Sequence, residues 1–202
     1  MPLVDAADGV HLLCPRQCAE DPHASAVIAR WVDGAAPIAA ASIGQAAMRR
    51  DPMAMLPFCG YNMGDYWAHW LSFPERTDKL PKIFHVNWFR QDEDGKFMWP
   101  GFGENLRVLR WIIDRVEGRA HARETPIGLL PNAEDIDTSE LDIDERTMRK
   151  LTTINPVTWA EEMEAIGEYL GTFGERTPRA LLEEQQRIKA ELDAVDWPPA
   201  GN

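Results

Sequence analysis

The stretch KIFHVNWFRQDEDGKFMWPGFGEN, residues 82–105, decides how this chain of 202 residues is organised. Side chains in residues 82–89 alternate between two sets, which is typical of a β-strand. Residues 92–95 read Asp-Glu-Asp-Gly, and a glycine in such a turn accepts a positive φ angle. Residues 96–99 can then return as a second strand. The pattern predicts a β-hairpin over residues 82–99, followed by a Pro-Gly-Phe-Gly loop.

The same stretch carries large aromatic side chains beside exposed backbone. These are Trp88, Phe89, Phe97, Trp99 and Phe102. An aromatic side chain that stacks on a base contributes about 1–3 kcal/mol, and a glycine-rich loop before a helix offers backbone N–H groups to an anion. Both features suit a purine nucleotide. Spacing alone, however, favours the core of the hairpin over a binding site for these aromatic side chains.

The rest of the chain is predicted to be mainly helical. We expect helices over residues 61–73, 105–117, 139–151, 158–172 and 177–195, and a short strand over 125–130. Asn105 is a candidate N-cap, Gly118 a candidate stop, and Thr158 with Glu161 a candidate capping box. An apolar stripe on helix 105–117 is expected to face the core: Leu106, Leu109, Ile112, Ile113 and Val116. The predicted fold class is α/β, or an α+β-like fragment, with a partial mixed sheet, a hairpin and C-terminal helices.

Composition excludes several classes of protein. The formal net charge is −12, from 33 acidic and 21 basic residues, which argues against binding nucleic acid through its phosphates. Seven carboxylates without a basic residue lie in residues 134–145, and we interpret them as a solvated acidic loop. No apolar run is long enough for a membrane span, and no secretory signal is visible. The three cysteines are expected to be reduced thiols, as in a cytoplasmic protein.

A second stretch, DPMAMLPFCGYNMGDYWAHW at residues 51–70, strengthens a family resemblance. Together with residues 82–105, it resembles the C-terminal part of GTP-dependent phosphoenolpyruvate carboxykinases, from about Arg49 onward. The resemblance implies a P-loop-containing mixed α/β domain. It also implies the gluconeogenic reaction of oxaloacetate and GTP to phosphoenolpyruvate, GDP and CO₂, a lyase-type decarboxylation that uses Mn²⁺ or Mg²⁺.

The resemblance also assigns residues to a guanine site. Phe89 and Phe102 match the phenylalanines that sandwich the guanine ring, and Asn105 matches the asparagine that contacts the purine. Supporting roles fall on Trp88, Phe97, Trp99, Gly103 and Glu104. Phe58 and Asn62 are weaker candidate contacts. The bound nucleotide would be GTP or GDP.

What the sequence lacks limits this interpretation. No Gly-x4-Gly-Lys-Ser/Thr phosphate loop occurs in the 202 residues. The family's metal ligands and oxaloacetate-binding arginines would lie upstream of residue 1, so we assign no catalytic residue and no metal ligand here. Whether the chain alone is an enzyme stays open, and we expect it to be incomplete.

The first 48 residues read differently from the rest of the chain. They lack the family's lid sequence, and we expect an atypical segment that is either disordered or the product of a disrupted reading frame. Residues 49–202 would form the C-terminal nucleotide-binding region. The missing N-terminal part of the enzyme, as a separate chain, is a candidate partner. The alternatives are a non-catalytic nucleotide-binding or interaction module, and a decayed gene fragment.

Overall fold

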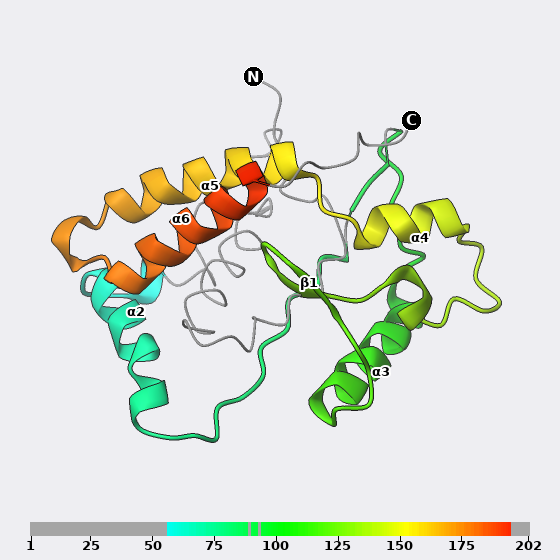
Figure 1. Ribbon diagram of the computed structural model, residues 1–202, viewed down its shortest axis with the longest axis horizontal. Coiled ribbons are helices and arrows are strands. Elements are labelled where there is room, and N and C mark those ends of the chain that lie inside the picture. The colour runs from blue at the N-terminus through cyan, green and yellow to red at the C-terminus, as the bar shows by residue number, and fades with distance from the viewer. Residues whose placement is uncertain (1–55, 89, 93, 195–202) are drawn as a thin grey trace.

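The computed structural model describes residues 56–88, 90–92 and 94–194 (Figure 1). Its α-helices are α2 (Met63–Leu71), α3 (Asn105–Val116), α4 (Glu145–Thr152), α5 (Pro156–Gly171) and α6 (Arg179–Ala194). Its strands are β1 (Arg123–Thr125) and β2 (Gly128–Leu130), which form one antiparallel pair. Short 3₁₀ turns include η2 (Leu56–Phe58), η4 (Phe102–Glu104) and η5 (Ala133–Asp135). The described residues therefore combine helices with a small sheet, which agrees with the predicted mixed class of fold. None of the helices among them is long and apolar enough to cross a membrane.

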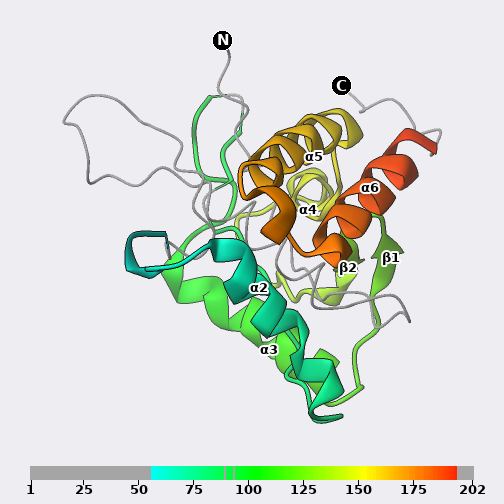
Figure 2. The same cartoon turned by 90° about the vertical axis from the view of Figure 1, so that its left-hand side faces the viewer.

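Two apolar clusters hold these elements together. The first cluster joins α2, α5, α6 and the β1–β2 hairpin through buried side chains that include Trp67, Leu130, Met163 and Leu181. The second cluster joins α3 and α4 through Trp99, Val108, Trp111, Ile136, Met148 and Leu151. Figure 1 shows α2, α5 and α6 on one side of the hairpin and α3 and α4 on the other, and Figure 2 shows the same helices from the side. Burial of this apolar surface is the main favourable contribution to folding.

The β1–β2 hairpin replaces the single strand that we predicted over residues 125–130. The chain reverses between Thr125 and Gly128, which are paired in the register. The Thr125 hydroxyl donates to the Gly128 carbonyl at 2.6 Å, and Gly128 has a φ of +134°. A glycine accepts this φ at little cost. The single-strand prediction was wrong because period-2 patterning does not reveal a reversal within six residues.

The predicted strands of residues 82–99 were also wrong. Residues 82–88 form no strand, and the following turn is closed by one isolated bridge between Gln91 and Phe97. The turn itself is present: the Asp92 N–H donates to the Lys96 carbonyl at 2.9 Å, and Gly95 has a φ of +77°. Phe84, Val86 and Trp88 pack against the second cluster. Side-chain packing thus holds this segment in place, and not the ladder of strand hydrogen bonds that we expected.

Helix α3 was predicted correctly in extent but wrongly in orientation. Its expected apolar stripe faces outward, except for half-buried Ile112, and the buried side chains are Val108 and Trp111. The tryptophan brings more apolar surface to the core than an aliphatic side chain does. Gly118, with a φ of +75°, follows the helix as predicted.

The predicted helix caps were less accurate. Asn105 does not cap α3, because its side chain bonds to Trp99. Helix α5 is capped by Asn155, whose Oδ1 accepts from the N–H groups of Val157 and Thr158, and not by a box starting at Thr158. Helix α4 begins at Glu145, six residues later than expected, because Asp144 caps it through the Thr147 N–H. A capping side chain thus marks the start of each of these helices.

Candidate functional site

The loop from Trp99 to Asn105 is held by a partly buried hydrogen bond. Trp99 is 2% exposed, and its indole N–H donates to the Asn105 Oδ1 atom at 2.9 Å. Trp99 lies in the second cluster and Asn105 is the first residue of α3. A buried indole N–H requires an acceptor, so this bond fixes both ends of the loop.

Phe102 projects from that fixed loop into solvent. Its side chain is 93% exposed, although phenylalanine is among the residues most often buried. Gly101 before it has a φ of +114° and a ψ of −162°, a backbone conformation that is essentially restricted to glycine. The loop therefore presents one exposed aromatic ring, flanked in sequence by Gly101 and Gly103.

The other predicted aromatic residues of the site differ in their exposure. Phe97 is 53% exposed, Trp88 is half-buried against the second cluster, and Phe89 lies outside the described residues. Gly103 is exposed within η4. The structure thus places Phe97, Trp99, Phe102, Gly103, Glu104 and Asn105 in one turn and loop, which has both buried and exposed aromatic faces.

Arg107 ties this loop to the acidic segment at Asp137, which follows η5. Its Nε atom donates to Glu104 at 2.7 Å, and Nη1 donates to the Asp137 carbonyl at 2.9 Å. The hydrogen bond to Glu104 raises the pKa of Arg107, while the hydrogen bond from Ser139 lowers the pKa of Asp137. Sequence analysis missed Arg107, although its spacing of three from Glu104 is a recognisable helical ion-pair signal.

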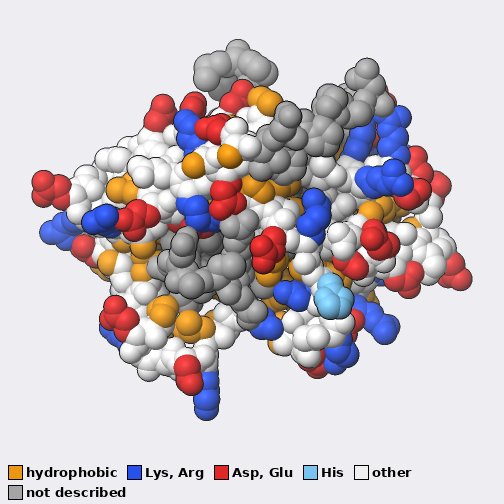
Figure 3. All heavy atoms as spheres, in the orientation of Figure 1, with side chains coloured by type: hydrophobic (Ala, Val, Ile, Leu, Met, Phe, Trp, Pro, Cys, Tyr) orange, Lys and Arg blue, Asp and Glu red, His pale blue; other side chains and the backbone are white. Residues whose placement is uncertain are grey.

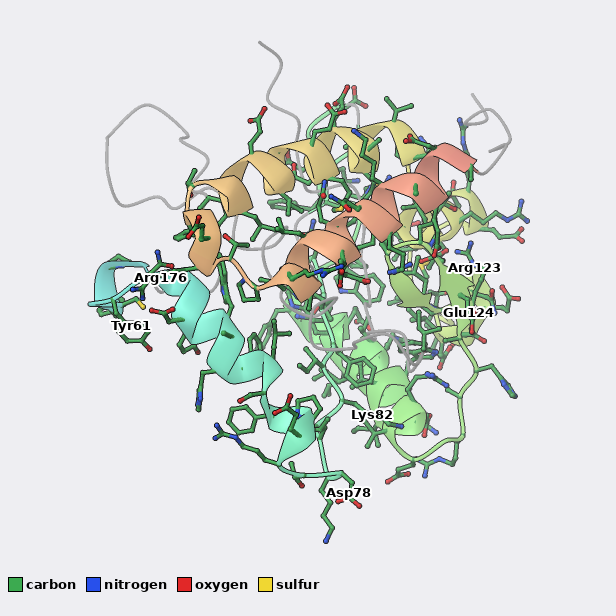
Figure 4. All side chains as sticks on the ribbon, turned by 60° about the vertical axis from the view of Figure 1, so that its left-hand side comes forward. Tyr61, Asp78, Lys82, Arg123, Glu124 and Arg176 are labelled. Carbon is green, nitrogen blue, oxygen red and sulfur yellow. The ribbon has the colours of Figure 1, made fainter. Side chains whose placement is uncertain are left out.

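Lys82 stabilises the other end of α3. Its ammonium group donates to the carbonyls of Arg115 and Val116 at 3.1 and 3.2 Å, and Figure 4 shows Lys82 beside this helix. A cation at a helix C-terminus satisfies carbonyls that have no partner within the helix. Helix α3 is thus held at both ends, which keeps the loop before it in place.

Phe58 and Asn62 do not join the loop. Asn62 caps α2: its Oδ1 accepts from the Gly64 N–H at 2.8 Å, and its Nδ2 donates to the Phe173 carbonyl at 3.4 Å. Phe58, in η2, is 81% exposed. Helix α2 lies on the opposite side of the molecule from α3 in Figure 1. Figure 4 shows Tyr61 and Arg176 at this end, where Arg176 pairs with Asp65.

The structure also contains a cavity that sequence analysis did not anticipate. It has a volume of about 660 Å³ and lies between β1, η5 and α4, with Arg123, Asp137 and Arg149 among its lining residues. None of the predicted nucleotide-binding residues lines it. Arginine and carboxylate side chains are mixed in its wall, so the cavity has no uniform charge that would select an anion or a cation.

The described residues do not fit a divalent metal site. Among them, no group of three His, Cys, Asp or Glu side chains gathers closely enough to hold an ion. The acidic segment at residues 134–145 uses several of its carboxylates locally: Asp135 binds Asn132, Asp144 caps α4 and Glu145 pairs with Arg149. These side chains are committed to turns and caps, and we assign them no metal.

Comparison with known proteins gives the family. The family model named phosphoenolpyruvate carboxykinase C-terminal P-loop domain matches residues 17–191 of this chain. This range begins within the first 48 residues, which read differently from the rest of the chain. The GTP-dependent phosphoenolpyruvate carboxykinases of Neocallimastix frontalis and Chlamydia trachomatis are 53% and 52% identical to this chain over 161 and 155 residues. That of Paenarthrobacter aurescens is 49% identical over 156 residues.

In each of these three comparisons the aligned region covers 76% of this chain and 26% of the relative, so the chain spans about a quarter of the length of the relatives it matches. The matching model is that of a C-terminal domain, and the aligned region includes most of the residues that the structure describes. This chain therefore belongs to the family of GTP-dependent phosphoenolpyruvate carboxykinases and corresponds to its C-terminal part.

Proposed function

We propose that this chain forms the wall of a carboxykinase nucleotide site that binds guanine. The observation that carries the proposal is the Trp99–Asn105 loop: a ring that is 93% exposed at Phe102, on a backbone fixed by the Trp99–Asn105 hydrogen bond. An aromatic ring has few rotatable bonds, so on a fixed backbone it loses little entropy when a base stacks on it. The relatives that share this sequence are GTP-dependent enzymes.

In this proposal the residues have distinct roles. Phe102 stacks on the base, with Phe89 on its opposite face, and Phe97 lies at the rim of the site. Trp88 and Trp99 support the loop from the second cluster. Gly103, Glu104 and Asn105 provide polar groups around the purine edge, while Phe58 and Asn62 contribute weakly. The nucleotide-binding region is residues 49–202, and its boundary at residue 49 lies outside the described residues.

In this proposal, the chain alone does not catalyse the carboxykinase reaction. Phosphoryl transfer needs a phosphate cradle and metal ions that neutralise the developing charge. The sequence has no Walker-type loop, and the described residues form no metal-binding group. In this proposal, decarboxylation of oxaloacetate with GTP, and the Mn²⁺ or Mg²⁺ that it requires, also depend on carboxykinase sequence outside the aligned region, which covers 26% of each relative.

Weak binding of GTP is the expected result for the chain alone. Two stacking contacts of about 1–3 kcal/mol each give roughly 6 kcal/mol at most before ordering costs, and about 4 kcal/mol corresponds to millimolar affinity. Saturation-transfer NMR detects ligands in this range. We expect magnetisation to reach the guanine H8 proton of GTP, and Phe102→Ala to abolish the transfer.

The matched control is Phe73→Ala, which removes a 38% exposed ring that follows α2. This variant should keep the H8 signal. Retention of the signal in Phe102→Ala, or equal signals from GTP and ATP, would refute the proposed site. Micromolar affinity for GTP would refute the statement that the chain holds only part of the site.

A further inference from the structure

Helix α3 has an apolar face that the described residues do not cover. Leu106 is 72% exposed, Leu109 42%, Ile113 53% and Val116 51%. Their spacing of three and four residues places them on one side of the helix. Val108 and Trp111, which are buried, lie on another side. We call the four exposed residues the outer face of α3.

The outer face differs from an ordinary solvated surface. Scattered exposed apolar residues are common, but a continuous apolar row marks an interaction site. Helix α3 has a separate charged side, where Arg110 and Asp114 lie 4.0 Å apart and the Arg110 side chain is 86% exposed. On the part of the surface drawn in Figure 3, apolar side chains lie mostly between charged ones. Helix α3 therefore exposes a charged side and an apolar side, and the apolar side has the character of a contact surface for a partner.

The position of the outer face and the length of the relatives indicate which partner. The carboxykinase of Neocallimastix frontalis aligns over 26% of its length, so roughly three quarters of it has no counterpart in the aligned region. The matching family model describes a P-loop domain, whereas the described residues contain a single two-stranded sheet and the sequence has no P-loop motif. The elements that complete such a domain must pack against apolar surface of this part.

We infer that the outer face of α3 is the surface on which the remaining carboxykinase sequence packs. The inference rests on the proposed function and extends it, because η4 (Phe102–Glu104) leads directly into α3. A partner seated on α3 lies next to the exposed Phe102 ring. A docked partner therefore encloses the base that stacks on Phe102 and strengthens binding of GTP.

Co-purification tests the surface directly. The full 202-residue chain is co-expressed with a tagged version of the part of the Neocallimastix frontalis enzyme that it does not match. We expect the two to co-purify, Ile113→Glu and Leu109→Glu to abolish the complex, and Arg110→Glu on the charged side to preserve it. A complex that survives both apolar substitutions overturns the inference.

A chimera covers the case in which that part of the Neocallimastix frontalis enzyme does not fold alone. The segment of this chain that aligns with the enzyme replaces the matching segment in the full-length enzyme. Ile113→Glu should lower the Tm of the chimera, while leaving the Tm of the isolated chain unchanged and Arg110→Glu neutral in both. Equal effects of Ile113→Glu and Arg110→Glu in the chimera overturn the inference.

Two other occupants of the surface give distinct results. If a second copy covers the face, the isolated chain sediments as a dimer that Ile113→Glu dissociates. If the chain covers the face itself, Leu109→Cys resists maleimide labelling in the isolated protein. Either result overturns the inference. Saturation transfer to GTP on the same samples separates the two proposals. An H8 signal without a complex supports the nucleotide site and refutes the docking surface. A complex without the H8 signal supports the docking surface and refutes the nucleotide site.

Discussion

Gly64 shows how one backbone contact fixes the position of α2. It lies in the first turn of α2 and is buried. A Cβ atom added here would overlap the Arg176 carbonyl oxygen and lie 2.7 Å from the carbonyl carbon. Backbone atoms cannot move aside as a flexible side chain does, so the close approach of α2 to the turn before α6 depends on glycine.

Gly64→Ala should therefore destabilise the protein. We expect a loss of about 1–3 kcal/mol, the usual effect of overpacking, measured from urea unfolding. Gly171→Ala is the matched control, because a Cβ at that helical position meets no atom within 4 Å. An unchanged unfolding midpoint in Gly64→Ala would show that α2 does not approach Arg176 as described.

Asn105 has a structural role that can be separated from its proposed contact with the purine. Asn105→Ala leaves the buried Trp99 indole N–H without its acceptor and should cost about 1–3 kcal/mol of folding stability. Asn105→Asp keeps an acceptor oxygen and should remain close to wild type in urea unfolding. Because it replaces the amide by a carboxylate, it should still weaken GTP in saturation transfer. Equal stability of the two variants would contradict the importance of the hydrogen bond.

At the scale of elements, Arg187 links α6 to the β1–β2 hairpin. Its guanidinium donates to both Glu184 oxygens at 2.7 and 2.6 Å, to Glu191 at 2.7 Å and to the Pro126 carbonyl at 3.3 Å. The Glu184 side chain is only 9% exposed. The hydrogen bond to Glu184 raises the pKa of Arg187 further above its ordinary value, so the group stays charged.

Replacing Arg187 by methionine should destabilise the protein by about 3 kcal/mol, since it removes the cation beside a buried carboxylate. Arg187→Lys should lie between methionine and wild type, because lysine restores the charge but not the bidentate geometry. Urea unfolding of the three proteins gives the ranking. A methionine variant as stable as wild type would mean that apolar packing around α6 outweighs the ion pairs.

The start of α4 should respond to acid. The hydrogen bond from Thr147 to the capping carboxylate lowers the pKa of Asp144 below its ordinary value of 3.8. A depressed folded-state pKa means that the cap stabilises the helix above the ordinary pKa and that this contribution is lost as pH falls through the folded pKa. The protection factors of α4 amides, which compare the observed exchange with the intrinsic rate at the same pH, should therefore fall below about pH 4. Asp144→Asn, which caps without titrating, should remove most of this dependence in α4.

The helices could be predicted from sequence more completely than the strands. Repeating apolar positions locate α2, α3, α5 and α6 closely, because many residues contribute to each pattern. The β1–β2 hairpin and the isolated bridge at Gln91 involve only a few residues, so their sequence patterns are short. Tertiary packing decides which side of α3 is buried, and this is the side of Val108 and Trp111. The sequence predicts the loop at Phe102 as a nucleotide contact, which stays a prediction. The contacts of Arg107 with Asp137 and of Lys82 with α3 depend on segments that are distant in sequence and meet only on folding.

At the scale of the whole molecule, the two apolar clusters differ in how completely they are enclosed. The first cluster lies between α2, α5, α6 and the hairpin, and the Gln185 side chain donates to the Met163 carbonyl at 2.6 Å within it. The second cluster is bounded by α3, whose outer face is exposed. Local stability follows the number of buried apolar contacts, so the two parts of the molecule should open independently.

Hydrogen exchange followed by mass spectrometry tests this difference. We expect α5 and α6 to exchange most slowly and α3 to exchange faster, because α3 buries only part of its apolar surface. Val108→Ala removes a fully buried side chain from the second cluster and should accelerate α3 and α4 while leaving α5 and α6 nearly unchanged. Met163→Ala in the first cluster is the reciprocal variant and should accelerate α5 and α6. If both variants accelerate every helix alike, the clusters unfold as one cooperative unit and the exposed face of α3 does not weaken its part of the molecule.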